Sequence, residues 1–350
     1  MQTIHVHTST AYEVQIGKGI LESAGEKIAA LSRAKRVMIV SDDIVFPLYG
    51  ERVSKSLTDA GFTVSSFVFA NGEERKRLST IEALLEQMAA EHFSRSDLIV
   101  ALGGGVVGDM AGFAASIFLR GIAYVQIPTT LLAAVDSSVG GKTAVDLSRG
   151  KNLCGAFHQP LLVLCDTDTL QTLKPIHIED GLAEMLKYGV ICDAELFDKV
   201  KNYKNNDMEA LIARCVEIKR DVVSGDEFDR GRRQLLNLGH TIGHAVEAAS
   251  NFTLTHGHGV AIGLAIIARA AEKKGMAKAG MAKEIEDALI ACDLPTATDY
   301  DTELLSELTL SDKKTDGDHI NLILPLEIGN TVIHRLPKSE IIHWIRSGSN

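Results

Sequence analysis

The sequence predicts an α/β domain followed by a mostly α-helical domain. Two observations carry this prediction: short apolar runs alternate with amphipathic segments in the first half, and long helical patterns succeed one another in the second. The pattern changes near Lys174-Pro175, so we expect one domain at residues 1–174 and another at residues 175–350. A chain of 350 residues is long enough to bury a core in each of them.

The apolar runs of the first half have the length of buried strands. They are RVMIV at 36–40, TVSSFVFA at 63–70, DLIVAL at 97–102, AYVQIP at 123–128 and LLVLCD at 161–166. Helical patterns such as ERVSKSLTDAG and STIEALLEQMAAEH lie between the earlier runs. Strands that alternate with helices indicate βαβ units, in which helices cover both faces of a parallel sheet.

The second half is dominated by helical patterns. They are GLAEMLKYGVI, MEALIARCVEIKRDVVS, RQLLNLGHTIGHAVEAAS, VAIGLAIIARAAEKKG and AKEIEDALIAC. Only HINLILPLEIGNTVIHRL, near the end, has the extended pattern of a small hairpin. The second domain is therefore expected to be helical apart from this hairpin.

Composition and charge argue against several classes of function. The formal net charge is −10 at pH 7, which disfavours nucleic-acid binding and a basic membrane-binding surface. The longest apolar stretches, such as VAIGLAIIA, are too short to span a bilayer, and the first residues do not have the pattern of a signal peptide. The 5 cysteines are widely spaced and form no C-x-x-C motif, which is typical of a reducing compartment, so we expect a cytoplasmic protein.

A glycine-rich loop follows the predicted strand at 97–102. Gly103, Gly105 and Gly108 in ALGGGVVGDMAG satisfy the pattern G-x-G-x-x-G. Glycines after a strand let the backbone approach a pyrophosphate, whose charge is met by N–H groups at the start of the next helix. The acid that usually follows about 20 residues later is missing, so a tight turn that packs helix on sheet is the alternative. We favour a Rossmann-like dinucleotide-binding domain.

A second glycine-rich segment occupies residues 128–160. Its GGKT sequence is not a nucleotide-triphosphate loop, because Asp136 stands where that motif needs a glycine. Lys142, Arg149, Lys151 and Asn152 supply cationic and amide donors that suit a phosphate or a carboxylate. Long polar segments inside compact domains are uncommon unless they are functional, so a merely solvated loop is the weaker alternative.

Histidines and a glutamate are grouped on the helical patterns of the second half. His240 and His244 lie four residues apart in LLNLGHTIGHAVE and share one face of the predicted helix. Glu184 lies in GLAEMLKYG, and both His256 and His258 lie in THGHGVAIG. One glutamate and two or three histidines from separate helices match a zinc site that keeps an open position. The alternatives are core histidines and an ion pair between Glu184 and Lys187.

On these motifs the chain resembles the 3-dehydroquinate synthase family along nearly its whole length. The matching segments include NGEERK, GGGVVGD, FLRG, IPTTLLAAVDSSVGGKTAVD, GKNLCGAFHQP, GLAEMLKYG, LLNLGHTIGHAVE and SDKK. The resemblance implies an enzyme of the shikimate pathway that converts the sugar phosphate 3-deoxy-D-arabino-heptulosonate 7-phosphate to 3-dehydroquinate and phosphate. It also implies NAD, a divalent metal (zinc or cobalt), a helical metal-binding C-terminal domain and a homodimer.

The resemblance further implies a role for each residue that matches a family motif. The metal ligands are matched by Glu184, His240 and His256. The positions that hold NAD are matched by Glu73, Lys76, Gly103, Gly104, Gly105, Asp109, Thr129, Thr130, Asp136, Lys142, Lys151 and Thr172, and the adenosine-ribose acid by Asp42 or Asp43, of which we take Asp42. The catalytic and substrate-binding positions are matched by Lys142, Asn152, Arg120, Lys219, Arg233 and His244, and by Lys313 or Lys314, of which we take Lys314.

The chemistry of the implied reaction agrees with this division of residues. A metal that lowers the pKa of a secondary hydroxyl eases the removal of hydride by NAD. The resulting ketone acidifies the neighbouring C–H, so that phosphate leaves by β-elimination. In the family the substrate's own phosphate takes that proton, so the protein needs cations around the phosphate and no strong base. The resemblance accordingly assigns His244 to the substrate or its phosphate and not to the metal.

One position departs from the family pattern. His258 stands in HGHG where the family commonly has a glutamate. We expect His258 to lie beyond the metal's own ligands, so that its loss leaves metal binding intact. Glu247 lies three residues after His244 and is either a partner that orients this histidine or a surface carboxylate.

Two other classes of enzyme share parts of this framework. Related sugar-phosphate cyclases, such as 2-deoxy-scyllo-inosose synthase, differ mainly in their substrate contacts, and Asn152, Arg233 and the SDKK lysines favour the dehydroquinate reaction. Metal-dependent polyol dehydrogenases share the GGG loop, but the DSSVGGKT segment disfavours them. A protein that only binds NAD or a metal is the remaining alternative, and nothing in the sequence favours it.

Overall fold

The computed structural model describes residues 1–311 and 315–349, which form two compact units. Residues 1–173 and 216–228 make up the first unit, and residues 174–215 and the chain from 229 onward make up the second. Helix α7 (Met208–Gly225) therefore contributes its first part to the second unit and its last part to the first. The sequence pattern places this helix entirely in the helical half, because periodicity does not reveal which neighbours a helix packs against.

A mostly parallel sheet forms the centre of the first unit. Among the described residues it has seven strands in the order β1-β2-β9-β6-β5-β3-β4. The strands are β1 (Gln2–Val6), β2 (Tyr12–Gly17), β3 (Arg36–Asp42), β4 (Thr63–Phe69), β5 (Leu98–Gly103), β6 (Ala123–Pro128) and β9 (Leu162–Asp166). Only β1 and β2 pair antiparallel; the other neighbouring strands are parallel. The predicted α/β class is confirmed, while the hairpin of β1 and β2 was not predicted.

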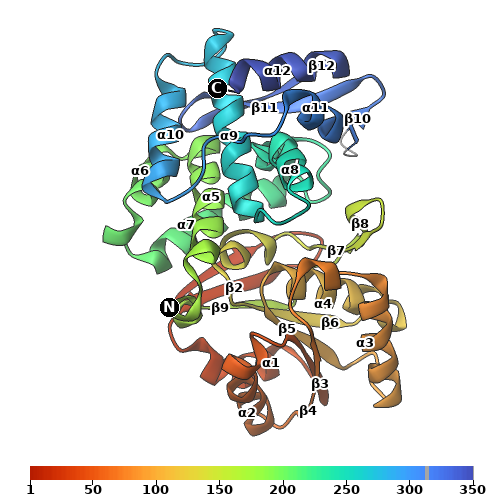
Figure 1. Cartoon of the computed structure of the whole chain (residues 1–350). Coiled ribbons are helices and arrows are strands. Elements are labelled where there is room, and N and C mark those ends of the chain that lie inside the picture. Colours follow the sequence, from red (N-terminus) through yellow and green to blue (C-terminus); the bar gives the residue numbers. More distant parts are fainter. Residues whose placement is uncertain (312–314, 350) are drawn as a thin grey trace. The chain divides into compact units, whose positions relative to one another are not determined.

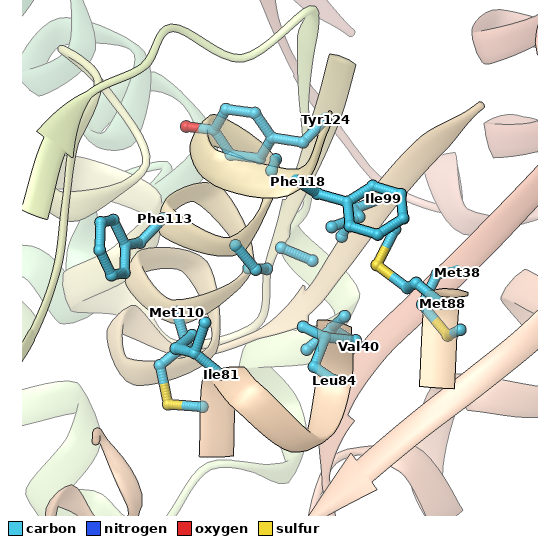
Figure 2. Close-up of a cluster of buried hydrophobic side chains, with 14 of the residues drawn as sticks. Met38, Val40, Ile81, Leu84, Met88, Ile99, Met110, Phe113, Phe118 and Tyr124 are labelled. Atoms are coloured by element: carbon cyan, nitrogen blue, oxygen red, sulfur yellow. The ribbon is translucent and has the colours of Figure 1, made fainter. Parts of the chain in front are cut away.

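Helices cover both faces of this sheet (Figure 1). They are α1 (Ala24–Leu31), α2 (Glu51–Asp59), α3 (Leu78–Ala90) and α4 (Gly105–Ile117). On β3, Val37 and Ile39 pack in the core beneath α1 and α2, whereas Met38 and Val40 pack with α3 and α4. Figure 2 shows the second of these cores. Successive residues of a strand point to opposite faces, which is why one continuous apolar run serves both cores.

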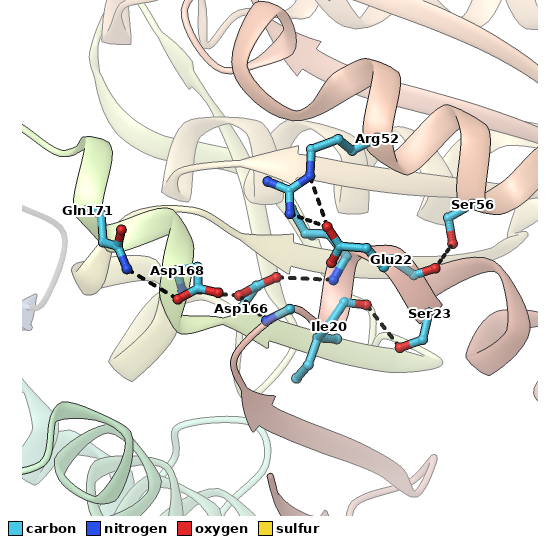
Figure 3. Close-up of polar contacts among 10 residues, drawn as sticks. Ile20, Glu22, Ser23, Arg52, Ser56, Asp166, Asp168 and Gln171 are labelled. Carbon is cyan, nitrogen blue, oxygen red and sulfur yellow. Dashed lines mark hydrogen bonds and ion pairs between the residues drawn. The ribbon is translucent and has the colours of Figure 1, made fainter.

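Part of the polar segment at 128–160 forms a β-hairpin. Residues Lys142–Leu147 form β7 and residues Gly150–Phe157 form β8, which pair as an antiparallel hairpin. Elsewhere in the first unit, Asp166 ends β9 and fixes the turn after β2. Its Oδ1 accepts the N–H of Gly19 at 3.0 Å and its Oδ2 accepts the N–H of Leu21 at 3.1 Å (Figure 3).

The second unit is helical apart from one small sheet, as predicted. Its helices are α5 (Pro175–Cys192), α6 (Ala194–Lys201), the start of α7, α8 (His240–Ala249), α9 (His256–Lys273), α10 (Met281–Ala291), α11 (Thr302–Ser311) and α12 (Ile341–Gly348). The sheet contains β10 (Thr315–Asp316), β11 (His319–Glu327) and β12 (Asn330–Pro337), all antiparallel. None of the helices within the described ranges has both the length and the apolar character needed to cross a membrane.

Asp97, just before β5, anchors the ends of neighbouring segments. It is buried; its Oδ1 accepts the N–H groups of Lys35 and Arg36 at 3.2 and 2.9 Å, and its Oδ2 accepts the N–H and the hydroxyl of Ser94, both at 2.7 Å. Burial raises the pKa of Asp97, but the hydrogen bonds from Ser94, Arg36 and Lys35 outweigh it and hold the pKa below its usual value.

Replacing Asp97 by asparagine is expected to lower the free energy of unfolding by about 1–3 kcal/mol, because an amide can accept at only one of the two positions. A lowered folded-state pKa means that the carboxylate stabilises the fold above its unfolded pKa and loses this effect as the pH falls through the folded value. Urea unfolding at pH 7 and at pH 3 checks both points. The difference in the free energy of unfolding between wild type and Asp97→Asn should be smaller at pH 3 than at pH 7. An unchanged gap would show that the charge contributes nothing.

Candidate active site

The glycine loop after β5 lies at the switch point of the sheet. β4 lies on one side of β3 and β5 on the other, so the order in which strands are added reverses at β3. In open α/β sheets, ligands bind at the carboxyl ends of the strands beside such a reversal. Asp42 ends β3 and Gly103 ends β5, so two of the predicted NAD positions meet at this point.

Helix α4 begins directly after the loop, at Gly105. Its N-cap residue is Gly104, and among the described residues no side chain caps it. The N–H groups of the first helical turn therefore suit an anion such as a pyrophosphate. Gly108 has a different role, because a Cβ there would lie 2.6 Å from Oε1 of Gln126 on β6. The loop has the anion-binding geometry, and its last glycine also lets the helix pack on the sheet.

The two acids considered for the ribose differ in exposure. Asp42 is buried; its Oδ1 accepts the N–H groups of Ile44 and Val45 at 2.9 and 2.8 Å, and its Oδ2 accepts from Nδ2 of Asn71 at 3.0 Å. Asp43 is exposed, and its Oδ1 accepts the N–H of Asn71 at 2.8 Å. Asp42 thus shapes the turn after β3, while Asp43 presents its carboxylate to solvent.

Two further predicted NAD positions, Thr129 and Thr130, lie beside the glycine loop. The N–H of Thr129 donates to the carbonyl of Gly103 at 3.0 Å, and a Cβ on Gly104 would lie 3.1 Å from Cγ2 of Thr130. Thr172 is anchored separately, since its hydroxyl lies 2.6 Å from that of Tyr49.

Lys76 is a buried cation that connects residues of both predicted sets. Its Nζ lies 2.6 Å from Oδ2 of Asp109 and 2.5 Å from Oδ1 of Asn152. Burial lowers the pKa of Lys76, but the charges of Asp109 and Glu73 outweigh it and raise this pKa above its usual value. The ammonium therefore stays protonated and links two predicted NAD positions with a predicted substrate position.

The residues around Asn152 are held in an unusual backbone conformation. Asn152 has a φ of 53°, and its N–H donates to Oδ1 of Asp146 at 2.7 Å. The neighbouring Lys151 places its Nζ 3.6 Å from Oε1 of Glu73. Arg120 also has a left-handed φ, of 71°. Such strained conformations persist where their surroundings enforce them, and they are common at functional sites.

Lys219 lies in the part of α7 that belongs to the first unit. Its Nζ is 2.8 Å from Oδ1 of Asp136 and 2.6 Å from the carbonyl oxygen of the same residue. The structure thus pairs a predicted substrate cation with a predicted NAD position. Lys142, which is assigned to both sets, is exposed and begins β7.

In the second unit, glycines allow α8 and α9 to touch along their backbones. A Cβ on Gly263 of α9 would lie 2.0 Å from the carbonyl oxygen of Gly239, and one on Gly243 of α8 would lie 2.7 Å from the carbonyl oxygen of Gly259. Gly259 and Gly263 are four residues apart on α9 and so share one face, which Gly243 of α8 and its N-cap residue Gly239 contact. We call these four glycines the α8–α9 seam. It brings the histidines at the starts of both helices close together.

Glu184, His240 and His256 converge as predicted from three separate helices. The Nε2 atoms of His240 and His256 lie 3.4 and 3.5 Å from the same oxygen, Oε1 of Glu184. One ligand atom from each of the three residues lies within 4.8 Å of the others. Glu184 is fully buried, and its Oε1 has no hydrogen-bond partner among the described residues. A buried carboxylate with two imidazole nitrogens around it fits a divalent metal ion.

The other ring nitrogen of each histidine is held by an acceptor. Nδ1 of His240 donates to the carbonyl oxygen of Leu238 at 3.1 Å, and Nδ1 of His256 donates to Oε1 of Glu247 at 2.9 Å. Carbonyls and carboxylates only accept, so Nδ1 carries a proton in both rings and Nε2 is the nitrogen that can bind a metal. Burial lowers the pKa of His256, but Glu247 and Glu184 outweigh it and raise this pKa to about 10. The negative charge that favours a proton there also favours a metal cation.

Two residues near this cluster were not assigned to the site from the sequence. Lys187 is buried and forms an ion pair with Oε2 of Glu184. Glu184 therefore makes the ion pair that was the alternative to a metal site, and it also faces the two histidines with its other oxygen. Glu247 is also buried, which overturns the alternative of a surface carboxylate, and its Oε1 accepts from Nδ1 of His256. The spacing of three residues between Glu184 and Lys187 is the sequence signal that indicates their contact. The sequence has no comparable signal for the burial of Glu247, because that burial depends on packing against α9.

His244 and His258 lie beside the cluster in different ways. The ring centroid of His244 is 5.5 Å from that of His240 and 5.8 Å from that of His256. His244 also forms a second possible ligand group with Glu247 and His256. Nε2 of His258 instead donates to Oε2 of Glu179 at 2.9 Å, and His258 belongs to neither ligand group.

The remaining predicted residues are placed as follows. Arg233 is buried in a short helical turn at 232–237. Arg120 is exposed in the turn after α4. Lys313 and Lys314 lie outside the described residues.

Two family models match the chain. The model described as 3-dehydroquinate synthase N-terminal matches residues 66–180, and the model described as 3-dehydroquinate synthase C-terminal matches residues 181–315. Among curated proteins, the 3-dehydroquinate synthase of Clostridium acetobutylicum is 40% identical, over 99% of this chain and 99% of that protein.

Solved structures of related enzymes resemble the chain over its whole length. A structure of 2-deoxy-scyllo-inosose synthase complexed with carbaglucose-6-phosphate, NAD+ and Co2+ has a TM-score of 0.88 at 28% identity, covering 99% of this chain and 100% of that one. The 2-epi-5-epi-valiolone synthase from Streptomyces hygroscopicus, with NAD+ and Zn2+ bound, has a TM-score of 0.89 at 28% identity, covering 99% and 98%.

Proposed function

The chain belongs to the 3-dehydroquinate synthase family, and from this premise we propose how its side chains divide the reaction. The enzyme is a carbon–oxygen lyase that converts 3-deoxy-D-arabino-heptulosonate 7-phosphate to 3-dehydroquinate and phosphate, using NAD and a divalent metal. When bound, NAD accepts and returns a hydride, and the metal acts as a Lewis acid on the substrate hydroxyl.

The observation that carries the proposed site is the meeting of Glu184, His240 and His256. These residues would hold the metal, because a buried carboxylate and two Nε2 atoms face one another with both Nδ1 protons already engaged. Such a set supplies three ligands and leaves a position for the substrate. Lys187 forms an ion pair with the second oxygen of Glu184, which offsets part of the cost of burying this carboxylate.

The proposed NAD site rests on the switch point of the sheet in the first unit. The start of α4, with Gly103, Gly104 and Gly105, would bind the pyrophosphate through backbone N–H groups. Side chains that would surround the dinucleotide are Asp42, Glu73, Lys76, Asp109, Thr129, Thr130, Asp136, Lys142, Lys151 and Thr172. Asp43, which is the more exposed of the two acids, is the better placed to accept from a ribose hydroxyl.

Cations and polar groups are proposed to hold the substrate and its phosphate. They are Lys142, Asn152, Arg120, Lys219, Arg233, His244 and Lys314. A phosphate dianion that takes the proton in the elimination needs charge-assisted donors and no separate strong base. The pairing of Lys219 with Asp136 and of Asn152 with Lys76 supports this, because both groups are oriented by the protein itself.

Release of inorganic phosphate tests the reaction. With NAD and zinc or cobalt, the enzyme should release phosphate from the heptulosonate phosphate and not from glucose 6-phosphate, and no NADH should accumulate. Chelation should stop the release, and added metal should restore it. Net NADH formation would indicate a dehydrogenase, and preference for glucose 6-phosphate would indicate another cyclase.

His258 is proposed to act outside the metal's ligands, and its bond to Glu179 supports this. The His258→Ala variant should therefore still bind zinc, whereas His256→Ala should lose it. Competition with a chelating dye measures both affinities. If His258→Ala lost zinc as fully as His256→Ala, His258 would be a ligand and this assignment would be wrong.

Two broader properties follow from the family membership as proposals. The enzyme is proposed to be a homodimer, which light scattering at several concentrations tests directly. A cytoplasmic location is proposed because none of the 5 cysteines, all of which lie within the described residues, forms a disulfide. Fractionation of cells that express the protein would test the location.

A further inference from the structure

Glu247 is a buried carboxylate to which the reaction gives no role. It lies on α8 and is only 1% exposed. Burying an ionised carboxylate is costly unless a partner compensates its charge and donates hydrogen bonds to it. The partner here is His256, whose Nδ1 donates to Oε1 of Glu247 at 2.9 Å.

The α8–α9 seam makes room for this contact. A Cβ on Gly259 of α9 would lie 2.8 Å from Cγ of Glu247 and 3.0 Å from the carbonyl oxygen of Gly243. Gly259 lies three residues after His256, on the same face of α9. One glycine therefore lets the carboxylate of α8 reach the imidazole of α9.

The geometry points to Glu247 as a positioning residue for the metal ligand His256, an inference that rests on the proposed metal site. By accepting a hydrogen bond from the Nδ1–H group, Glu247 fixes the ring orientation in which Nε2 of His256 faces Glu184. His240 obtains the same restraint from the carbonyl of Leu238, which no side-chain substitution removes. The orientation of His256, unlike that of His240, thus depends on a side chain that can be replaced. Carboxylate partners of metal-binding histidines generally raise metal affinity in this way.

Two variants separate hydrogen bonding from packing. Glu247→Met keeps much of the side-chain volume but has no acceptor, and it should lower zinc affinity about 10–100-fold. Glu247→Gln keeps an acceptor oxygen but not the negative charge, so its zinc affinity should lie between those of wild type and Glu247→Met. Zinc affinity is measured by competition with a chelating dye, and thermal unfolding of the metal-free proteins shows that each variant is folded. In the zinc-loaded protein, the NMR signal of the His256 Nδ1 proton should be protected from exchange in wild type and lost in Glu247→Met.

Glu272→Gln is the matched control. Glu272 lies near the opposite end of α9, where its carboxylate accepts the N–H groups of Gly280 and Ala282 at 2.9 and 2.8 Å. Its replacement should leave zinc affinity unchanged. If wild type binds zinc and Glu247→Met binds it equally well, the positioning role is wrong while the metal site stands. If wild type itself binds no zinc, the metal site fails and this inference fails with it.

Discussion

Replacing Glu184 by glutamine should reduce phosphate release on the order of a thousandfold, because the metal's contribution to the reaction amounts to several kcal/mol. Glutamine keeps the shape of the side chain but removes the negative charge that faces both Nε2 atoms. Zinc affinity should fall together with activity. Phosphate release and dye competition on the same preparation measure the two effects.

Glu195→Gln provides the control for the loss of a glutamate charge in the helical unit. Glu195 lies on α6 and pairs with Lys199 at the surface, where its side chain is 78% exposed. An exposed pair of this kind contributes about 0–1 kcal/mol, so activity and zinc affinity should not change. If Glu184→Gln bound zinc as tightly as wild type, Glu184 would serve only as the partner of Lys187.

Replacing Lys76 by methionine should lower the free energy of unfolding by about 3 kcal/mol, because it leaves the partly buried carboxylate of Asp109 without this partner. Nζ of Lys76 lies 2.6 Å from Oδ2 of Asp109. Burial already raises the pKa of Asp109 above its usual value. Without Lys76 this pKa should rise further. Urea unfolding between pH 4 and pH 8 measures the effect.

The sign of the pH dependence identifies the cause. A carboxyl group whose folded pKa is raised favours folding below its unfolded pKa, and this effect disappears as the pH rises through the folded value. The deficit of Lys76→Met should thus be small at pH 4 and full at pH 8. The control Lys55→Met removes an exposed lysine that pairs with Asp59 at 2.5 Å, and it should change stability by less than about 1 kcal/mol. A deficit independent of pH would mean that lost packing, and not the charge of Asp109, is responsible.

The sequence predicted those parts of the fold that follow from a pattern within a single segment. The run at 36–40 reads as a buried strand because β3 is covered on both faces, so it needs no polar alternation. The division of α7 was not predictable from its pattern. It depends on contacts distant in sequence, such as the ion pair of Lys219 with Asp136.

The candidate site shows the same limit. The spacing of His240 and His244 correctly indicated a shared helix face, but only the chain fold shows which ring nitrogen each neighbour engages. Glu247 looked like a surface residue because its burial is decided by Gly259 on the next helix. Sequence patterns report the faces of single helices, whereas partners across a helix pair require the three-dimensional packing.

The route of the chain through α7 has a consequence for synthesis on the ribosome. Asp136 and Ser9 of the first unit bind Lys219 and Glu227, with Ser9 donating its N–H to Glu227 at 2.8 Å. The first unit is therefore incomplete until residue 228 has left the exit tunnel, by which time α5 and α6 are already available. Domains usually fold in the order in which they emerge. In this chain the first unit instead cannot be completed before part of the second has emerged, and a fragment that stops at residue 173 would emerge with Asp136 and Ser9 lacking these partners.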